Sequence, residues 1–337
     1  IDEPTSRTPL ANANAPAAAH RHHGWPASGK GTSACTAKAP TVRNIGGILG
    51  IAAFSVSVSF RIPSLAAQPA LPNIRLSPST PAYGVPSRSP CVFASIGPMA
   101  VHPNPPAFGR RALPIRERVM LQPEEPPVCA WQASDARAFA GYVLSLAGAH
   151  SDRPGIVAVD GRGGAGKTTL TSMLVSASPG AQVLHIDDVD WNEPLYQWDH
   201  LLVTALGELH RAGSLDFTPP AWHRHGREGS IVVPAGAPFV IVEGTGAGMR
   251  AVADLIDVHI WIQTDDDAAE ERGIRRDTEE GTNGDAEESV RFWHWWMAGE
   301  RAFFAADRPW ERAHLIVSGE RLPGLGDNEI AWAEGPI

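Results

Sequence analysis

Eight residues near the middle of the chain combine glycines, a lysine and a threonine at fixed spacing. Residues 161–168 read GRGGAGKT and satisfy the pattern G-x-x-x-x-G-K-[ST]. Glycines let successive backbone N–H groups converge on a phosphate, and a following helix adds the partial positive charge of its N-terminus. Lys167 offers a cation to the β- and γ-phosphates, and the Thr168 hydroxyl suits a Mg²⁺ ion. The pattern predicts triphosphate binding by Gly161, Gly163, Gly164, Ala165, Gly166, Lys167, Thr168 and Thr169.

Acidic residues end the next apolar run, in the segment VLHIDDVDW. Transfer to a hydroxyl needs a carboxylate that takes its proton, and the carboxyl end of a strand facing the phosphate loop can hold one. Asp187, 20 residues beyond Lys167, is our choice for this base, with Asp188 and Asp190 as neighbouring carboxylates. The alternative interpretation is that these acidic residues cap the next helix.

Three arginines lie in the segment EERGIRRD, whose spacing predicts a helix. We expect Arg272 and Arg276 to close over the triphosphate as part of a mobile lid and to stabilise charge on the transferred group. The alternative is a solvated helix face, on which these arginines pair with the acidic residues beside them.

The apolar pattern around these residues predicts alternating strands and helices. Short apolar runs predict buried strands at 155–161, 181–188, 238–244, 258–264 and 313–319. Helical spacing predicts helices near 134–150, 167–176, 198–212, 266–277 and 286–306. Such an alternation predicts an α/β fold of three layers, the P-loop NTPase fold, with a parallel sheet between helices.

Composition divides the chain near residue 126. The first 125 residues are dense in Pro, Ala and Ser and hold 12 Lys and Arg against 5 Asp and Glu, whereas the rest hold 16 against 32. A segment of the first kind buries too little apolar surface to offset its ordering entropy. We expect residues 1–126 to be a largely disordered extension and residues 127–337 to form one kinase-like domain. The acidic balance of that domain disfavours nucleic acid and favours a small-molecule partner.

An apolar run at residues 44–60 follows four basic residues and is a candidate signal-peptide core or membrane anchor. The run is shorter than the roughly 20 residues of a spanning helix and is diluted by Gly and Ser, so we expect no membrane contact. Chemistry that uses ATP favours a cytoplasmic location. The sequence leaves the oligomeric state open.

Two absent motifs narrow the class of nucleotide-binding protein. Switch GTPases need an N-K-x-D motif, which the sequence lacks. Transporter and helicase ATPases usually end a strand in Asp-Glu, where the segment FVIVEG offers only Glu243. These absences favour a compact kinase.

Four segments, VDGRGGAGKTTL, HIDD, IVEGTGAG and ERGIRRD, resemble in their order and intervals the uridine kinase family. This family belongs with phosphoribulokinase and bacterial pantothenate kinase among P-loop kinases, and the resemblance is greater to the uridine-kinase-like proteins of actinobacteria. It covers about residues 155–319. It implies ATP-dependent phosphorylation of a nucleoside hydroxyl, with ATP and Mg²⁺ as cofactors.

The resemblance also implies roles for single residues. Asp187 matches the catalytic Asp, Glu243 the metal-associated Glu that acts with Thr168, and Arg272 and Arg276 the lid arginines. Acceptor-side candidates are Asp188, from its place beside Asp187, and, from the resemblance, Asp199, His225 and Arg227.

The acceptor side departs from the family pattern. The family has Asp-(Asp/Ser)-Phe-Tyr after its second strand, where this chain has Val189-Asp190 in place of the aromatic pair. A Tyr-Asp pair is replaced by Pro220-Ala221. A nucleoside acceptor is therefore expected by resemblance, and two alternatives stay open. One is a kinase of another small metabolite; the other is an ATPase or nucleotide-binding switch that acts on a protein.

Overall fold

The computed structural model describes residues 109–114 and 119–337. This part of the chain holds an eight-stranded sheet of order β1-β2-β10-β9-β8-β3-β7-β4. Five strands run parallel, namely β3 (Gly155–Gly161), β4 (Gln182–His185), β7 (Phe239–Glu243), β8 (Val258–Gln263) and β9 (Leu315–Ser318). Three antiparallel strands extend this sheet beyond β9, namely β10 (Glu329–Glu334), β2 (Gln132–Asp135) and β1 (Arg111–Ala112). The predicted α/β class is confirmed, with a sheet that is mostly rather than wholly parallel.

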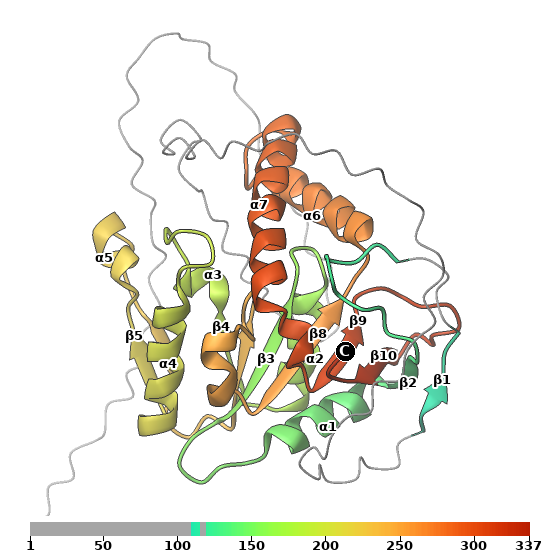
Figure 1. Ribbon diagram of the computed structural model, residues 1–337. Coiled ribbons are helices and arrows are strands. Elements are labelled where there is room, and N and C mark those ends of the chain that lie inside the picture. The colour runs from blue at the N-terminus through green and yellow to red at the C-terminus, as the bar shows by residue number, and fades with distance from the viewer. Residues whose placement is uncertain (1–108, 115–118) are drawn as a thin grey trace, which may run out of the picture. The chain divides into compact units, whose positions relative to one another are not determined.

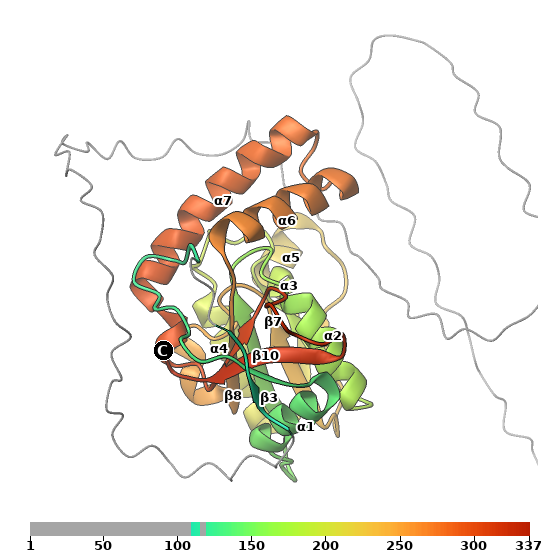
Figure 2. The same ribbon diagram turned by 90° about the vertical axis from the view of Figure 1, so that its right-hand side faces the viewer.

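Helices cover both faces of the sheet and complete three layers. The helices α1 (Ala136–Ala147) and α2 (Lys167–Ala177) pack on one face. The helix α4 (Asp199–Ala212) and the 3-10 helix η2 (Arg250–Leu255) pack on the other. Figure 2 shows α1 and α2 on one side of the strands and α4 on the opposite side.

Two longer helices lie beyond the carboxyl ends of the central strands (Figure 1). They are α6 (Asp266–Glu280) and α7 (Ala286–Asp307), and a short 3-10 helix, η3 (Pro309–Glu311), follows α7. Asp285 caps α7 through a capping box with Glu288, because each side chain accepts a hydrogen bond from the other residue's backbone N–H. Asp265 caps α6 in a similar way, accepting from the N–H groups of Asp267 and Ala268.

The segment between β4 and β7 forms a small subdomain beside the sheet. It contains α3 (Ile186–Val189), α4, and a two-stranded sheet of β5 (Leu215–Phe217) and β6 (Ile231–Val233). The helix α5 (Pro220–His225) lies between these two strands in sequence. The predicted strand at 181–188 ends earlier, at His185, and Asp187 and Asp188 occupy the first turn of α3. Carboxylates in this position stabilise a helix N-terminus.

Strand β3 is buried at every position and carries the phosphate loop on a rigid base. Ile156 and Ala158 face the α4 side, whereas Val157 and Val159 face α1 and α2. Because the strand contributes to both apolar layers, its carboxyl end has little freedom to shift.

The packed part of the chain begins before the predicted boundary at residue 126. Glu125 Oε1 accepts hydrogen bonds from Trp261 Nε1 at 2.7 Å and from Gln263 Nε2 at 3.0 Å. Gln122 Nε2 donates to Asp266 Oδ1 at 2.9 Å. These contacts are made by polar side chains, which a count of apolar residues does not register. The apolar run at 44–60 lies outside the described residues, among which no helix is long and apolar enough to cross a bilayer.

Candidate active site

The phosphate loop connects β3 to α2, in the strand-loop-helix context that the motif requires. Gly164 and Gly166 have φ values of 70° and 103°, where a side chain would be strained. A Cβ on Gly164 would also lie 2.2 Å from the carbonyl oxygen of Ala269. No side chain caps α2, and Thr168 and Thr169 are exposed in its first turn. The N-terminus of α2 is therefore available to an anion.

Lys167 is held above this loop by three oxygen atoms. Its Nζ donates to the carbonyls of Gly161 at 3.0 Å and Arg162 at 2.8 Å, and to Thr245 Oγ1 at 3.2 Å. Thr245 follows β7, so the lysine joins the loop after β3 to the loop after its neighbouring strand. The ammonium group is thereby positioned at the carboxyl edge of the sheet.

The predicted metal-binding residues lie together beside Lys167. Thr168 Oγ1 donates to Glu243 Oε1 at 3.3 Å, and His185 Nδ1 lies 2.8 Å from Glu243 Oε2. Desolvation would raise the pKa of Glu243, but the His185 hydrogen bond and the Lys167 charge outweigh it, so this pKa lies below its ordinary value. The same hydrogen bond raises the pKa of His185. A hydroxyl and a carboxylate fit Mg²⁺, which commonly takes one or two protein oxygens together with phosphate and water.

Asp187 lies two residues beyond His185, and His185 pairs in register with Glu243 across β4 and β7. Although Asp187 is exposed to solvent, the protein atoms around its carboxylate desolvate it, and this effect and the Glu243 charge raise its pKa. Lys167, His185 and Arg276 oppose the rise, so all three charges act on this carboxylate. Desolvation also raises the pKa of Asp190 well above its ordinary value. The Lys167 charge lowers the pKa of Asp187, whereas the charges of Asp187 and Asp188 raise that of Asp190 further.

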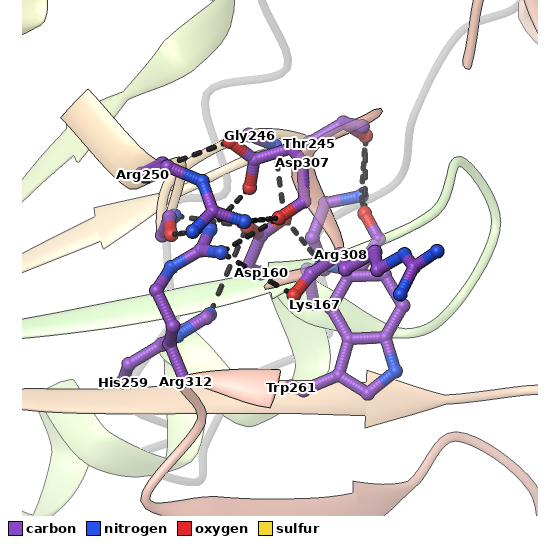
Figure 3. Close-up of polar contacts among 12 residues, drawn as sticks. Asp160, Lys167, Thr245, Gly246, Arg250, His259, Trp261, Asp307, Arg308 and Arg312 are labelled. Atoms are coloured by element: carbon purple, nitrogen blue, oxygen red, sulfur yellow. Dashed lines mark hydrogen bonds and ion pairs between the residues drawn. The ribbon is translucent and has the colours of Figure 1, made fainter. Parts of the chain in front are cut away.

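A buried carboxylate that the sequence reading did not select organises the loop after β7. Asp160 is fully buried and accepts hydrogen bonds from the backbone N–H groups of Gly161 at 2.7 Å, Gly246 at 2.8 Å and Gly248 at 2.9 Å. Figure 3 shows Asp160 between Lys167 and a second polar group of Arg250, Asp307 and Arg312. Asp160 thus ties the phosphate loop to the loop that carries Thr245.

Three of the four acceptor-side candidates lie together next to α3. Arg227 pairs with Asp188 at 2.5 Å, and its guanidinium carbon lies 3.6 Å from the centre of the Trp222 ring. The rings of His225 and Trp191 meet edge to face, with centroids 5.9 Å apart. Trp191 therefore supplies an aromatic side chain close to the point where the family's Phe-Tyr pair is missing. Arg227 stacks on Trp191 as well, at 5.4 Å.

The fourth candidate, Asp199, lies in a different place. It is exposed at the start of α4 and lines an open pocket of about 680 Å³ whose lining does not include Asp188, His225 or Arg227. The other lining residues are Tyr196, Gln197, Met249, Arg250, Ala251, Phe303 and Asp307. The pocket that Asp199 lines therefore does not contain the other three candidates.

The two lid arginines have different partners. Arg272 Nη1 donates to the carbonyl of Gly319 at 2.8 Å, and a Cβ on Gly319 would lie 2.2 Å from the carbonyl oxygen of Ala165 in the phosphate loop. Arg272 therefore lies beside the loop. Arg276 pairs with Asp277 at 2.7 Å and leaves 56% of its side chain exposed. The pairing with Asp277 is what the solvated-face alternative expects, but the Arg276 charge also acts on Asp187. The lid role remains a prediction for both arginines.

The base of the predicted lid is anchored to the phosphate loop. Arg162 Nη1 forms a hydrogen bond with Asp266 at the start of α6. Glu300 of α7 accepts from the Gly163 N–H at 2.7 Å. A signal for Glu300 was present in the sequence, because it lies on the same helical stripe as Trp293, Met297 and Phe304, all of which are buried. A signal for Asp160 was its position as the acidic residue in an otherwise apolar strand.

Comparison with known proteins points to kinases. No known family profile matches the chain. Two uridine kinases of Streptococcus agalactiae, from serotype V and serotype III strains, are each 25% identical over 146 residues, which cover 38% of this chain and 70% of the relative.

Two solved structures are also similar. One is a putative fructose transport system kinase from Silicibacter sp. TM1040, with a TM-score of 0.34, 22% identity, and coverage of 51% of this chain and 95% of that one. The other is a possible uridine kinase from Bacillus stearothermophilus, with a TM-score of 0.33, 18% identity, and coverage of 53% and 97%.

The phosphate loop in a three-layer α/β fold, together with the uridine kinase relatives, supports a P-loop kinase.

Proposed function

We propose that the protein transfers the γ-phosphoryl group of Mg·ATP to a hydroxyl group of a small molecule, with a nucleoside such as uridine or cytidine as the first candidate. One observation carries the proposal. Thr168, Glu243 and Lys167 lie together at the carboxyl edge of the sheet. The charges of Glu243 and Lys167 both act on the pKa of the Asp187 carboxylate. This arrangement supports a donor site with a base for the acceptor hydroxyl next to it.

In this proposal the residues divide the work of phosphoryl transfer. The loop amides and Lys167 hold the β- and γ-phosphates, and Asp187 accepts the proton of the attacking hydroxyl. Thr168 and Glu243 would hold Mg²⁺, which would supply positive charge against the developing charge of the phosphates. Arg272 and Arg276 would stabilise the transferred group when α6 draws closer to the nucleotide. We place this activity in the cytoplasm, where ATP is available.

The acceptor side favours a hydroxyl compound that carries no phosphate. Arg227 and Arg224, the arginines best placed to bind an existing phosphate, are paired with Asp188 at 2.5 Å and with Glu193 at 2.7 Å. The rings of Trp191 and Trp222 offer stacking surfaces beside them. A nucleoside would use both the rings and the carboxylates.

The direct test is ADP release by the full chain with Mg·ATP and a panel of acceptors. The panel contains uridine, cytidine, purine nucleosides, ribose and pantothenate. We expect a pyrimidine nucleoside to accelerate ADP release and to yield its monophosphate. Acceleration by a non-nucleoside alcohol alone would reject the nucleoside and keep the kinase. Slow hydrolysis that no alcohol stimulates would favour a nucleotide switch acting on a protein.

A further inference from the structure

The peptide unit between Arg162 and Gly163 is held from both ends. Its carbonyl oxygen accepts from Lys167 Nζ at 2.8 Å, and its N–H donates to Glu300 Oε1 at 2.7 Å. Lys167 belongs to the phosphate loop, whereas Glu300 lies on α7, more than 130 residues further along the chain. The orientation of this one peptide therefore couples the two groups.

Glu300 is fully buried, and a cation lies near the second oxygen of its carboxylate. The other oxygen, Oε2, lies 3.7 Å from Arg162 Nε, and Arg162 is only 2% exposed. Burial raises the pKa of Glu300, and the Arg162 charge opposes that rise. The carboxylate thus contacts both the backbone and the side chain at the start of the phosphate loop.

Close packing fills the space around this contact. A Cβ on Gly163 would lie 3.0 Å from the Trp293 ring, and a Cβ on Gly273 of α6 would lie 2.0 Å from the same ring. The Arg162 guanidinium also reaches Asp266, the first residue of α6. The loop, α6 and α7 therefore meet around the Arg162–Glu300 pair.

The buried Arg162–Glu300 ion pair is expected to contribute little to the stability of the fold. Desolvation of two buried charges roughly cancels their attraction, so buried ion pairs are often replaceable by apolar residues without loss of stability. What the pair does provide here is geometry. A freed Arg162–Gly163 peptide can rotate, and its carbonyl would then no longer face Lys167.

We propose that Glu300 is a positioning residue for the nucleotide phosphates. It fixes the Arg162–Gly163 peptide so that Lys167 and the loop amides stand ready for the β-phosphate. This inference rests on the phosphate-binding part of the proposed function and is independent of the acceptor.

The test is binding of ADP and of AMP by the full chain, measured by calorimetry and competition, for wild type, E300A, E300Q and E300D. The E287A variant is the control, because Glu287 is an exposed residue of the same helix. Loss of a charge-assisted hydrogen bond should raise the Kd for ADP in E300A about 10-fold or more. The Kd for AMP, which lacks the β-phosphate, should stay at the wild-type value.

The conservative variants separate positioning from folding. E300Q keeps an acceptor for the Gly163 N–H, so we expect it to retain most ADP affinity. E300D draws the carboxylate back by one methylene and should lose ADP affinity with AMP affinity kept; it replaces E300A if that variant does not fold. Equal losses for ADP and AMP, or no loss in E300A and E300D, would overturn the proposal. A wild-type chain that binds no ADP would overturn the proposed function as well.

Discussion

At the scale of single residues, Asp187 is the side chain on which the proposed transfer depends most. We expect D187N to lower kcat about 100-fold or more, because a positioned base contributes roughly 10²–10⁴ to such rates. The Kd for ATP should change little, since the proposed role of Asp187 is to act on the acceptor hydroxyl rather than to bind ATP. Steady-state kinetics with the best acceptor and direct ATP binding measure the two effects.

The matched control for this variant is D216N. Asp216 is an exposed residue of β5 and belongs to no part of the site. Its kinetics should match those of the wild-type protein. Unchanged turnover in D187N would remove Asp187 from the mechanism and leave the phosphate loop in place.

The shifted pKa values of Asp160 and His259 predict how the free energy of unfolding depends on pH. Burial raises the pKa of Asp160 to about 6, against its backbone hydrogen bonds. Burial, and after it the Arg312 charge, lowers the pKa of His259 to about 3. Between pH 3.8 and about 6 the folded protein keeps a proton on Asp160 that the unfolded chain releases, and it lacks one on His259 that the unfolded chain binds. The two linkage slopes cancel over this range.

Replacing His259 with Gln should remove one side of this balance. His259 stabilises the fold above pH 6.5, and this contribution is lost as the pH falls towards about 3. The difference in unfolding free energy, H259Q minus wild type, should therefore increase by about 1 kcal/mol for each unit by which the pH falls from 6 to 4. Urea unfolding at pH 4, 5, 6 and 7 measures the difference. Parallel pH profiles for the two proteins would show that His259 titrates normally.

Some site residues were predictable from the sequence, and others needed tertiary structure. Glu243 was assigned from the resemblance to the uridine kinase family, whereas Lys167 and Thr168 follow from a local pattern. Glu300 does not, because its partner at Gly163 is 137 residues away and no local pattern encodes that contact. Asp199 was assigned by resemblance alone, and the pocket that it lines does not contain the other acceptor-side candidates.

At the scale of elements, the contact between α6 and α7 can be tested with a matched pair of glycines. Gly273 is buried in α6 with its missing Cβ 2.0 Å from the Trp293 ring, whereas Gly141 in α1 has nothing within 4 Å. We expect G273A to lower the unfolding free energy by about 1–3 kcal/mol through overpacking. G141A should raise it by up to about 1 kcal/mol, because Ala favours a helix.

Urea unfolding of the two variants against wild type measures both effects. A stabilised G273A would mean that α6 and α7 separate readily in solution.

The five parallel strands and the main helices were predictable because each has its own apolar periodicity. The predicted helix at 266–277 runs on to Glu280, and the predicted helix at 286–306 ends at Asp307. Strands β1, β2, β5, β6 and β10 were missed. Strands β1, β5 and β6 have only two or three residues, too few for a periodic signal, and β2 and β10 pair with each other across nearly the whole domain. Pairing of that kind depends on topology rather than local sequence.

At the scale of the whole molecule, the start of the folded domain can be located by truncation. A chain that begins at residue 109 keeps Glu125 and its bonds to Trp261 and Gln263, whereas a chain that begins at residue 127 loses them. Each buried donor left without a partner, here on Trp261 and Gln263, costs about 1–3 kcal/mol. The free energy of unfolding of the shorter chain should therefore be lower by at least about 2 kcal/mol. Urea unfolding compares the two truncated chains. Equal stabilities would return the boundary to residue 126.

The eight-stranded sheet ends in short strands at both edges of the described domain. One edge is β1, with two residues, and the other is β4, with four. Unpaired backbone N–H and C=O groups at a sheet edge are a template on which a second chain can add a strand, and short edges limit that risk. Because both edge strands are short, protein molecules in a concentrated solution should not associate by adding strands to this sheet.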